Sequence, residues 1–212
     1  MSKFPLFNGL TEAEVQSIVE HPECEQILFK ANSTIYSADQ FRHAIGVILS
    51  GKAVAKNGDD SGVIVRCLSK GDCFGVAAVF VHNGKPYVSN ITAKTDCTVL
   101  FIPESVISVC LTQYKNFAVN YVSFLTGRIQ YLNRLVSAYS SPNVETKLAR
   151  FISAYVDGEA VPFDLNMTSL SKSLGIGRAS LYRALDSLES NGVIKRDSKR
   201  IIITDIKKIK QY

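Results

Sequence analysis

Residues 167–204 carry the pattern that most constrains the fold of this chain, MTSLSKSLGIGRASLYRALDSLESNGVIKRDSKRIIIT. Leu170 and Leu174 recur at helical spacing, and Thr168 is placed to cap this first helix. Gly175 follows at a position where the end of a helix needs a residue with positive φ. The pattern predicts a short helix that ends in a tight turn.

A second helix is predicted from about Gly177. Its apolar face is formed by Leu181, Leu185 and Leu188. The opposite or leading side keeps polar and basic residues, which are Arg178, Ser180, Tyr182 and Arg183. Two helices with a leucine face also occur as a plain helical hairpin inside a core, so the leucine pattern alone is a weak signal.

The residues after the second helix favour a DNA-binding module. Asn191 and Gly192 are a turn signal, and the β-branched runs VIK and IIIT flank the segment RDSKR. This predicted hairpin carries four basic residues, which are Lys195, Arg196, Lys199 and Arg200. A glycine turn, basic residues at the start of the second helix and a basic hairpin together predict a winged helix-turn-helix.

The charge distribution agrees with a DNA-binding module at the carboxyl end. The chain has a formal net charge of +5, and residues 141–212, with twelve Lys and Arg against eight Asp and Glu, account for +4 of it. The basic excess therefore lies with the helix pair, where a surface that binds phosphates needs it. We interpret Lys207, Lys208 and Lys210 as a solvated basic tail.

Composition predicts a folded, soluble protein with two modest domains. Hydrophobic residues make up 46% of the 212 residues, and the mean hydropathy is +0.09. No apolar run approaches the roughly 20 residues that a membrane span needs. The first residues, MSKFPLFNGL, lack the apolar core of a signal peptide, so we expect a cytoplasmic protein with no membrane partner.

The five cysteines are scattered along the chain without a C-x-x-C pair, at Cys24, Cys67, Cys73, Cys97 and Cys110. This spacing argues against a disulfide framework or a structural zinc site and indicates core thiols. The histidines at positions 21, 43 and 82 show no metal-ligand spacing, so no metal and no cofactor are predicted. Redox sensing through Cys24, Cys67 or Cys73 is an alternative that the sequence leaves open.

Residues 4–22 predict a first helix in which Thr11 and Glu14 form a capping box. From about residue 25 to residue 102 the pattern changes to short β-branched runs separated by glycine, such as AIGVILSGKAVAK and TDCTVLFI. Short strands at regular spacing predict an antiparallel barrel or sandwich.

Residues 115–139 predict a long helix with two apolar stripes. One stripe has the spacing of a coiled-coil seam, with Ala118, Val122, Leu125, Ile129, Leu132 and Val136. The other lies beside it, with Phe117, Tyr121, Phe124, Arg128, Tyr131 and Leu135. Both stripes could pack against the chain's own barrel, but a helix that is apolar on two adjacent faces needs two surfaces. We therefore expect a homodimer.

A hinge is predicted where Ser140, Ser141 and Pro142 interrupt the helical pattern. Pro142 suits the first turn of the next helix, VETKLARFISAYV. The predicted organisation is an effector-sensing β-barrel domain over residues 1–114, a dimerisation helix over 115–139 and a winged helix-turn-helix domain over 140–212.

The whole chain resembles the Crp/Fnr family of bacterial transcription regulators. The similarity runs from PLFNGLTEAEV through LSGKAVAK, LSKGDCFG and AKTDCTVLFI to LARFI and the helix pair. The resemblance implies an α+β fold with a cupin-like or jelly-roll-like antiparallel barrel of the cyclic-nucleotide-binding type, a parallel dimerisation helix and a C-terminal winged helix. It also implies binding to double-stranded DNA with a two-fold related operator, with RNA polymerase as a further candidate partner.

The chain departs from the family at the positions that bind cyclic AMP. Members that bind it carry a glutamate for the ribose and an Arg-Ser pair for the cyclic phosphate, and the aligned positions here hold Val76, Tyr87 and Val88. A buried phosphate without a guanidinium is an unpaired anion, which is costly in a low-dielectric pocket. Cyclic AMP and cyclic GMP are therefore not expected.

Other family cofactors are not expected either. Iron–sulfur members carry several cysteines near the N-terminus, where this chain has only Cys24. Haem-binding members use a barrel histidine, but His82 has no evident second axial ligand, and we interpret it as a surface loop residue.

The remaining pocket suits a small apolar or aromatic effector. Its predicted lining is Gly75, Val76, Ala77, Tyr87, Val88 and Ser89, with Phe124 from the long helix. These side chains could equally fill the barrel without a ligand, and DNA binding would then be constitutive.

The recognition helix departs from the family pattern E-x-x-S-R, because the equivalent positions hold Ala179, Tyr182 and Arg183. Arg183 can bond bidentately to guanine, whereas Ala179 offers only apolar contact, for example to a thymine methyl. The other candidate DNA contacts are Thr168, Ser169, Arg178 and Ser180 on the helices, with Lys199 and Arg200 on the wing for the DNA backbone.

The sequence gives no indication of an enzyme. It shows no nucleophile–base pair, no paired carboxylates and no phosphate-binding loop.

Overall fold

The computed structural model describes residues 4–37, 41–56, 64–82, 89–154, 167–197 and 200–212. The chain divides into two compact units, Met1–Thr126 and Gly127–Tyr212, and the division falls inside the long helix α3 (Lys115–Tyr139). The bounds of α3 are those that its periodicity predicts. Within the described ranges, no helix is long and apolar enough to cross a membrane.

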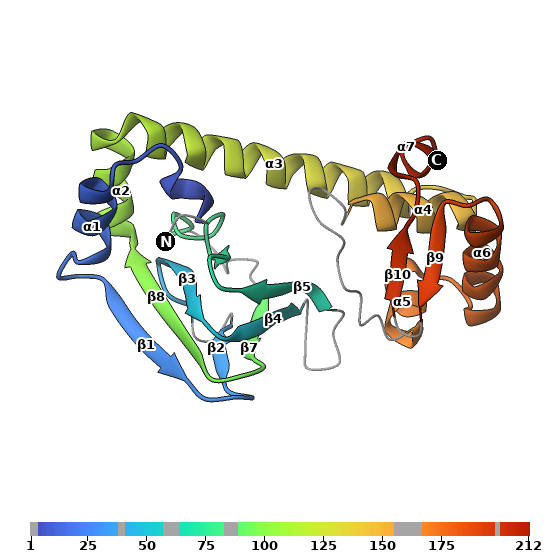
Figure 1. Ribbon diagram of the computed structural model, residues 1–212, viewed down its shortest axis with the longest axis horizontal. Helices are drawn as coiled ribbons and strands as arrows, with labels where there is room; N and C mark the ends of the chain where they lie inside the picture. The colour runs from blue at the N-terminus through green and yellow to red at the C-terminus, as the bar shows by residue number, and fades with distance from the viewer. Residues whose placement is uncertain (1–3, 38–40, 57–63, 83–88, 155–166, 198–199) are drawn as a thin grey trace. The chain divides into compact units, whose positions relative to one another are not determined.

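The described strands of the first unit form two four-stranded antiparallel sheets (Figure 1). One sheet has the order β1-β8-β3-β6 and the other the order β2-β7-β4-β5. The predicted jelly-roll-like domain is confirmed, as a pair of sheets rather than one closed ladder. The strands are β1 (Glu25–Phe29), β2 (Thr34–Tyr36), β3 (Ala44–Ser50), β4 (Lys52–Lys56), β5 (Ile64–Ser69), β6 (Cys73–Phe74), β7 (Asn90–Ala93) and β8 (Cys97–Pro103).

The central strands of the sheet β1-β8-β3-β6, β3 and β8, are buried on both faces. Strands β3 and β8 pair with Ile45 opposite Ile102, and both side chains lie in a cluster with the helices. The residue before Ile102, Phe101, points the other way into a core that both sheets share. Because successive side chains of a strand point to opposite faces, burial of both faces requires a nearly continuous apolar run. This requirement explains the segments AIGVIL and TVLFI.

Helices cover the outer face of this sheet. They are the 3-10 helix η1 (Pro5–Phe7), α1 (Glu12–Val19), α2 (Glu104–Gln113) and the first turns of α3. The predicted capping box is confirmed, because the Thr11 hydroxyl accepts from the Glu14 N–H and the Glu14 carboxylate accepts from the Thr11 N–H. The Asn120 side-chain amide of α3 donates to the carbonyls of Leu6 at 3.1 Å and Asn8 at 2.7 Å. These bonds fasten α3 to the amino-terminal segment.

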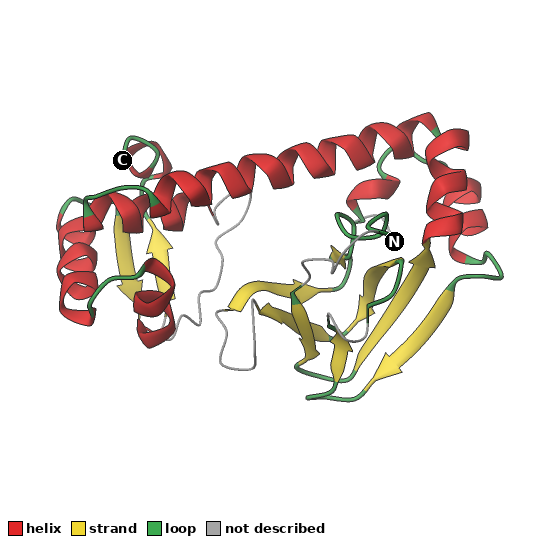
Figure 2. Ribbon diagram, turned by 180° about the vertical axis from the view of Figure 1, so that it is seen from behind, coloured by secondary structure: helices red, strands yellow, loops and turns green. Residues whose placement is uncertain are grey.

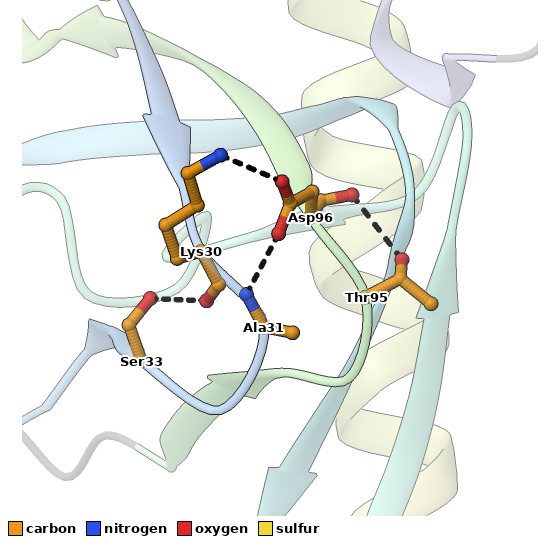
Figure 3. Close-up of polar contacts among 5 residues, drawn as sticks. All are labelled: Lys30, Ala31, Ser33, Thr95 and Asp96. Carbon is orange, nitrogen blue, oxygen red and sulfur yellow. Dashed lines mark hydrogen bonds and ion pairs between the residues drawn. The ribbon is translucent and has the colours of Figure 1, made fainter.

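Asp96, in the turn between β7 and β8, fixes the turn between β1 and β2 (Figure 3). Its carboxylate accepts from Lys30 Nζ at 2.9 Å and from the Ala31 N–H at 3.0 Å. The hydrogen bond from Lys30, followed by that from Ala31, lowers the pKa of Asp96. Because the ion pair is exposed, it sets the geometry of the two turns more than it stabilises the fold.

The second unit has helices packed around a two-stranded antiparallel sheet (Figure 2). Its elements are α4 (Val144–Ala154), α5 (Met167–Leu174), α6 (Arg178–Ser190), β9 (Ile194–Asp197), β10 (Arg200–Ile203) and α7 (Ile206–Ile209). Strand β9 pairs with β10 so that Ile194 lies opposite Ile203. A common core holds Leu148 and Ile152 of α4 together with the leucines of α5 and α6. The winged helix-turn-helix is confirmed.

The predicted role of Pro142 is wrong. Helix α4 begins at Val144, and its cap is Asn143, whose Oδ1 accepts from the N–H groups of Glu145 at 2.8 Å and Thr146 at 3.1 Å. Pro142 therefore precedes the cap instead of lying in the first turn. An asparagine satisfies free helix N–H groups directly, which proline at the first turn does not do.

The close approach of Gly46 to Phe74 yields a stability prediction. A Cβ at Gly46 would overlap the Phe74 ring, whereas one at Gly127 in α3 would meet nothing within 4 Å. We expect Gly46→Ala to lower the free energy of unfolding by about 1–3 kcal/mol through overpacking. The control Gly127→Ala should raise it by roughly 0.5–1 kcal/mol, because alanine favours a helix over glycine. Urea unfolding followed by circular dichroism measures both, and equal effects of the two variants would contradict the packing argument.

Candidate nucleic-acid interface and effector site

A tight turn sets the angle between α5 and α6. Gly175 has a φ of 62°, a conformation that favours glycine, and the Ile176 N–H donates to the Ser171 carbonyl at 3.0 Å. Gly177 is the N-cap of α6, as its place in the sequence predicts. The two helices are held together by buried leucines, which are Leu170, Leu174, Leu181 and Leu185. The turn and this core fix α6 as an exposed, rigidly mounted helix.

The outer face of α6 presents the predicted reading residues to solvent. Ala179, Tyr182 and Arg183 are exposed, and Ser180 is half-buried. Within the described part of the chain, the Arg183 guanidinium has no hydrogen bond or ion pair. It borders a hollow between α6 and the start of α4, lined by Asn143, Val144, Glu145, Ser180, Arg183 and Ala184. A cationic fork without an internal partner is suited to a base edge or a phosphate.

Thr168 and Arg178 contact one another. Arg178 Nη2 donates to Thr168 Oγ1 at 2.9 Å and so joins the first turns of α5 and α6. Because α5 begins at Met167, Thr168 lies inside the helix, and its predicted position at the cap is wrong. The side chain of Ser169 lies outside the described part of the structure. The contact orients Arg178 at the amino end of α6.

Arg196 of the wing binds acidic residues of α6. Its Nη2 lies 2.7 Å from Asp186 Oδ1 and 2.6 Å from Glu189 Oε2, and its N–H donates to Glu189 Oε1 at 2.8 Å. These hydrogen bonds, first the backbone bond and then that of the side chain, lower the pKa of Glu189. Arg196 therefore fastens the wing to α6. The predicted wing contacts, Lys199 and the Arg200 side chain, lie outside the described residues.

The segment that follows β6 carries the predicted effector residues. Gly75 has a φ of 80°, and a Cβ there would lie 2.7 Å from the Ala44 carbonyl oxygen. Val76 is buried, Ala77 is exposed and Ser89 is half-buried. Phe124 packs against the same cluster as Val76. Tyr87 and Val88 lie outside the described residues. The structure therefore places Val76 and Phe124 in the same apolar cluster.

A hydrogen bond joins this segment to α3. Tyr121 Oη donates to the Val76 carbonyl at 2.7 Å, and both residues are buried. Burial raises the pKa of Tyr121 to about 12, so the phenol remains a neutral donor. The sequence pattern identifies Tyr121 only as a member of an apolar stripe, because its partner is 45 residues away in the chain.

Tyr36 is a second buried tyrosine that the sequence pattern does not single out. It is 1% exposed, it packs edge-on against Phe74 and Phe41, and burial raises its pKa. Its hydroxyl has no hydrogen-bond partner among the described residues. A Cβ at Gly75 would lie 3.6 Å from this oxygen. The Tyr36 hydroxyl is thus a polar group in the interior between the sheets with which a ligand could form a hydrogen bond.

Two family models match the chain. Residues 26–114 match the Cyclic nucleotide-binding domain, and residues 146–212 match the Crp-like helix-turn-helix domain. The chain belongs to the Crp/Fnr family. It is therefore a DNA-binding transcription regulator of the Crp type.

Individual relatives agree with this membership. The cAMP-activated global transcriptional regulator CRP of Pasteurella multocida is 21% identical over 189 residues, which are 85% of this chain and 90% of that protein. A CooA mutant from Carboxydothermus hydrogenoformans has a TM-score of 0.69 at 17% identity, and the match covers 100% of this chain and 95% of the CooA chain. The Catabolite Activator Protein of Thermus thermophilus has a TM-score of 0.55 at 19% identity, with coverages of 98% and 97%. At these identities the solved structures show the fold alone.

The long helix of this Crp/Fnr-family regulator has one buried and one exposed apolar stripe. Phe117 and Tyr121 are buried against the sheet β1-β8-β3-β6, as expected for the aromatic stripe. Along the predicted seam, Ala118 and Leu125 are half-buried. The other seam residues are exposed, and they are Val122 (62%), Ile129 (58%), Leu132 (46%) and Val136 (64%).

Of the three cysteines considered for redox sensing in this Crp/Fnr-family regulator, Cys24 and Cys73 lie in surroundings that do not favour it. Burial, followed by the charge of Glu23, raises the pKa of Cys24 to about 11, so its thiol is protonated at neutral pH. Cys73 is buried, and Cys67 is exposed. A reactive cysteine needs a thiolate that is accessible to solvent, which Cys24 and Cys73 lack.

Proposed function

We propose that this chain is a homodimeric, sequence-specific transcription regulator whose barrel domain responds to a small effector other than a cyclic nucleotide. The outer face of α6 carries the proposal. It presents Ala179, Tyr182 and Arg183 to solvent, while Leu181 and Leu185 of the same helix hold it in the core. A helix mounted in this way, preceded by a tight turn and followed by a two-stranded wing, fits the major groove of DNA.

The exposed chemistry of α6 supports a division of labour on DNA. Arg183 is the side chain that can choose a base, because a guanidinium bonds bidentately to guanine in the major groove. Arg178 is oriented by Thr168 at 2.9 Å and suits a phosphate or a neighbouring base. Lys199 and Arg200 of the wing suit the backbone, which carries no sequence information. The glutamate of the family pattern is replaced by Ala179, so the preferred operator should differ from the family's usual one.

Arg183→Ala tests the assignment of the reading residue. We expect it to weaken binding to a selected operator by about 1–3 kcal/mol and to relax base preference, since a base contact is lost. Lys199→Ala should weaken specific and random duplexes alike. The control Lys210→Ala removes the same charge from the carboxyl tail and should change neither. Fluorescence anisotropy with both duplexes measures the effects, and equal losses for Arg183→Ala on the two duplexes would refute the assignment.

The exposed stripe of α3 supports a second copy of the chain as its partner. Val122, Ile129 and Val136 repeat every seven residues and are mostly exposed. Apolar residues at heptad spacing pair helices along a seam from which water is excluded. A two-fold dimer also matches two operator half-sites about 34 Å apart, which one reading helix cannot engage. The RNA polymerase contact stays a prediction.

Ile129→Glu tests the dimer. Because Ile129 is 58% exposed in the single chain, its substitution should leave the chain folded but place two charges across an apolar seam. We expect the variant to be monomeric in sedimentation velocity and to lose most of its operator affinity. The control is Gln130→Glu, which adds the same charge at the neighbouring exposed position and should remain dimeric. A dimeric Ile129→Glu variant would rule out the seam.

Two observations bear on the effector. The buried valine at the position of the family's glutamate, Val76, offers nothing to a ribose hydroxyl, and this supports a ligand without a sugar phosphate. The unpartnered Tyr36 hydroxyl supports a ligand with one hydrogen-bonding group. Against these, side chains from both sheets fill the core around Tyr36, which favours the second candidate, a constitutive regulator with a barrel that binds nothing.

Thermal unfolding separates these candidates. A ligand that binds the folded state raises the unfolding temperature. Cyclic AMP, which we expect not to bind, should leave this temperature unchanged at millimolar concentration. An effector in a metabolite panel should raise it. A concentration-dependent rise with cyclic AMP would contradict the proposed effector class. Full operator affinity without additions, together with no shift for any metabolite, would establish the constitutive candidate instead.

A further inference from the structure

Three potential metal ligands from distant parts of the chain meet at one edge of the first unit. His43 directly precedes β3, and Glu104 is the first residue of α2. His82 is the last residue of segment 75–82, which follows β6. One ligand atom from each lies within 4.8 Å of the others. His82 Nε2 is 3.0 Å from Glu104 Oε1, and His43 Nδ1 is 3.6 Å from Glu104 Oε2. The separations of 39 and 22 residues explain why sequence spacing gives no metal signal.

These distances match the separation of ligands around a small divalent ion. Zinc ligands at about 2.0–2.1 Å in a tetrahedral arrangement lie roughly 3.3 Å from one another. The two measured separations fall on either side of that value, so small rotations of the side chains suffice. Two imidazoles and one carboxylate are also ligands that zinc and related ions prefer.

The surroundings hold the three side chains in place. The Glu104 N–H donates to the His43 carbonyl at 2.9 Å, which fixes the start of α2 beside β3. The His43 Nδ1 bonds to the Val79 carbonyl at 3.1 Å, and an ion bound at Nδ1 takes the place of this hydrogen bond. The His43 ring also stacks on the His82 ring with an interplanar angle of 13° and packs edge-on against Phe41. Preorganised ligands reduce the ordering that an ion must impose.

The site is open to solvent. The side chains of His43 and His82 are 44% and 60% exposed, and that of Glu104 is 27% exposed. An ion can therefore reach the site, and water or an exogenous ligand can complete its coordination. Three protein ligands with one open position form an exchangeable site rather than a closed structural one.

We propose that His43, His82 and Glu104 bind a divalent transition metal ion of the zinc type. The ion joins the end of segment 75–82 to the start of β3 and to the start of α2. The same segment contains Val76, whose carbonyl accepts the Tyr121 hydrogen bond from α3. Phe80 of this segment also packs against Tyr121, with ring centroids 6.2 Å apart. Metal binding thus restrains the segment that contacts the first turns of α3.

Regulation of DNA binding by this ion rests on the proposed function. The segment and α3 share the Tyr121 contact, so an ion that restrains the segment biases the position of the helix. Metal binding itself is independent of DNA, and the two properties can be measured separately.

Cobalt titration of the full chain tests the site. The probe is Co²⁺, whose visible absorption reports nitrogen and oxygen coordination, with Zn²⁺ as competitor and with accessible thiols alkylated beforehand. We expect one equivalent to bind. His82→Ala and Glu104→Gln should each bind at least about tenfold more weakly, since each removes a direct ligand. The control His21→Ala removes the remaining histidine of the chain and should bind as the unmodified protein does.

Unchanged Co²⁺ binding by His82→Ala, with the same thermal unfolding temperature as the parent without metal, would overturn the site. His82 is exposed, so this variant should fold. The second arm compares operator affinity with and without Zn²⁺, where the parent and His21→Ala should respond and His82→Ala should not. Metal binding without any operator binding would overturn the proposed function and leave the site intact. Operator binding with no Co²⁺ binding would overturn the metal site and leave the proposed function intact.

Discussion

Burial of strands β3 and β8 on both faces is the constraint on which the first unit depends. One face forms the interior core with the second sheet, and the other supports α1, α2 and the start of α3. A strand covered on both sides needs side chains that are apolar in both directions, and β3 and β8 accordingly contain no charged residue. His43 directly precedes β3, and Glu104 directly follows β8.

Periodicity predicts the parts of this structure whose contacts are local. The bounds of α3, the capping box of Thr11 and Glu14 and the glycine turn before α6 all follow from residues within a few positions of each other. The paired apolar stripes of α3 were also predictable, because each stripe has its own spacing. These features agree with the sequence because the same few residues both specify and stabilise them.

Contacts between distant residues could not be predicted in this way. The Tyr121 bond to Val76, the unpartnered Tyr36 hydroxyl and the cluster of His43, His82 and Glu104 depend on the order of strands in the sheets. The errors at Pro142 and Thr168 have a different cause. At the first, the neighbouring Asn143 caps the free N–H groups of α4. At the second, α5 begins one residue earlier, and the Thr168 hydroxyl accepts from Arg178 instead. Helix ends are decided by such small differences.

The bonds from Arg196 to Asp186 and Glu189 have a mechanical consequence. They tie the wing to α6 one to two turns beyond Tyr182 and Arg183, so helix and wing turn as one body. Under the proposed function, α6 contacts bases and the wing contacts the DNA backbone. A rotation of this body is then expected to move both sets of contacts together, because Arg196 joins the two elements.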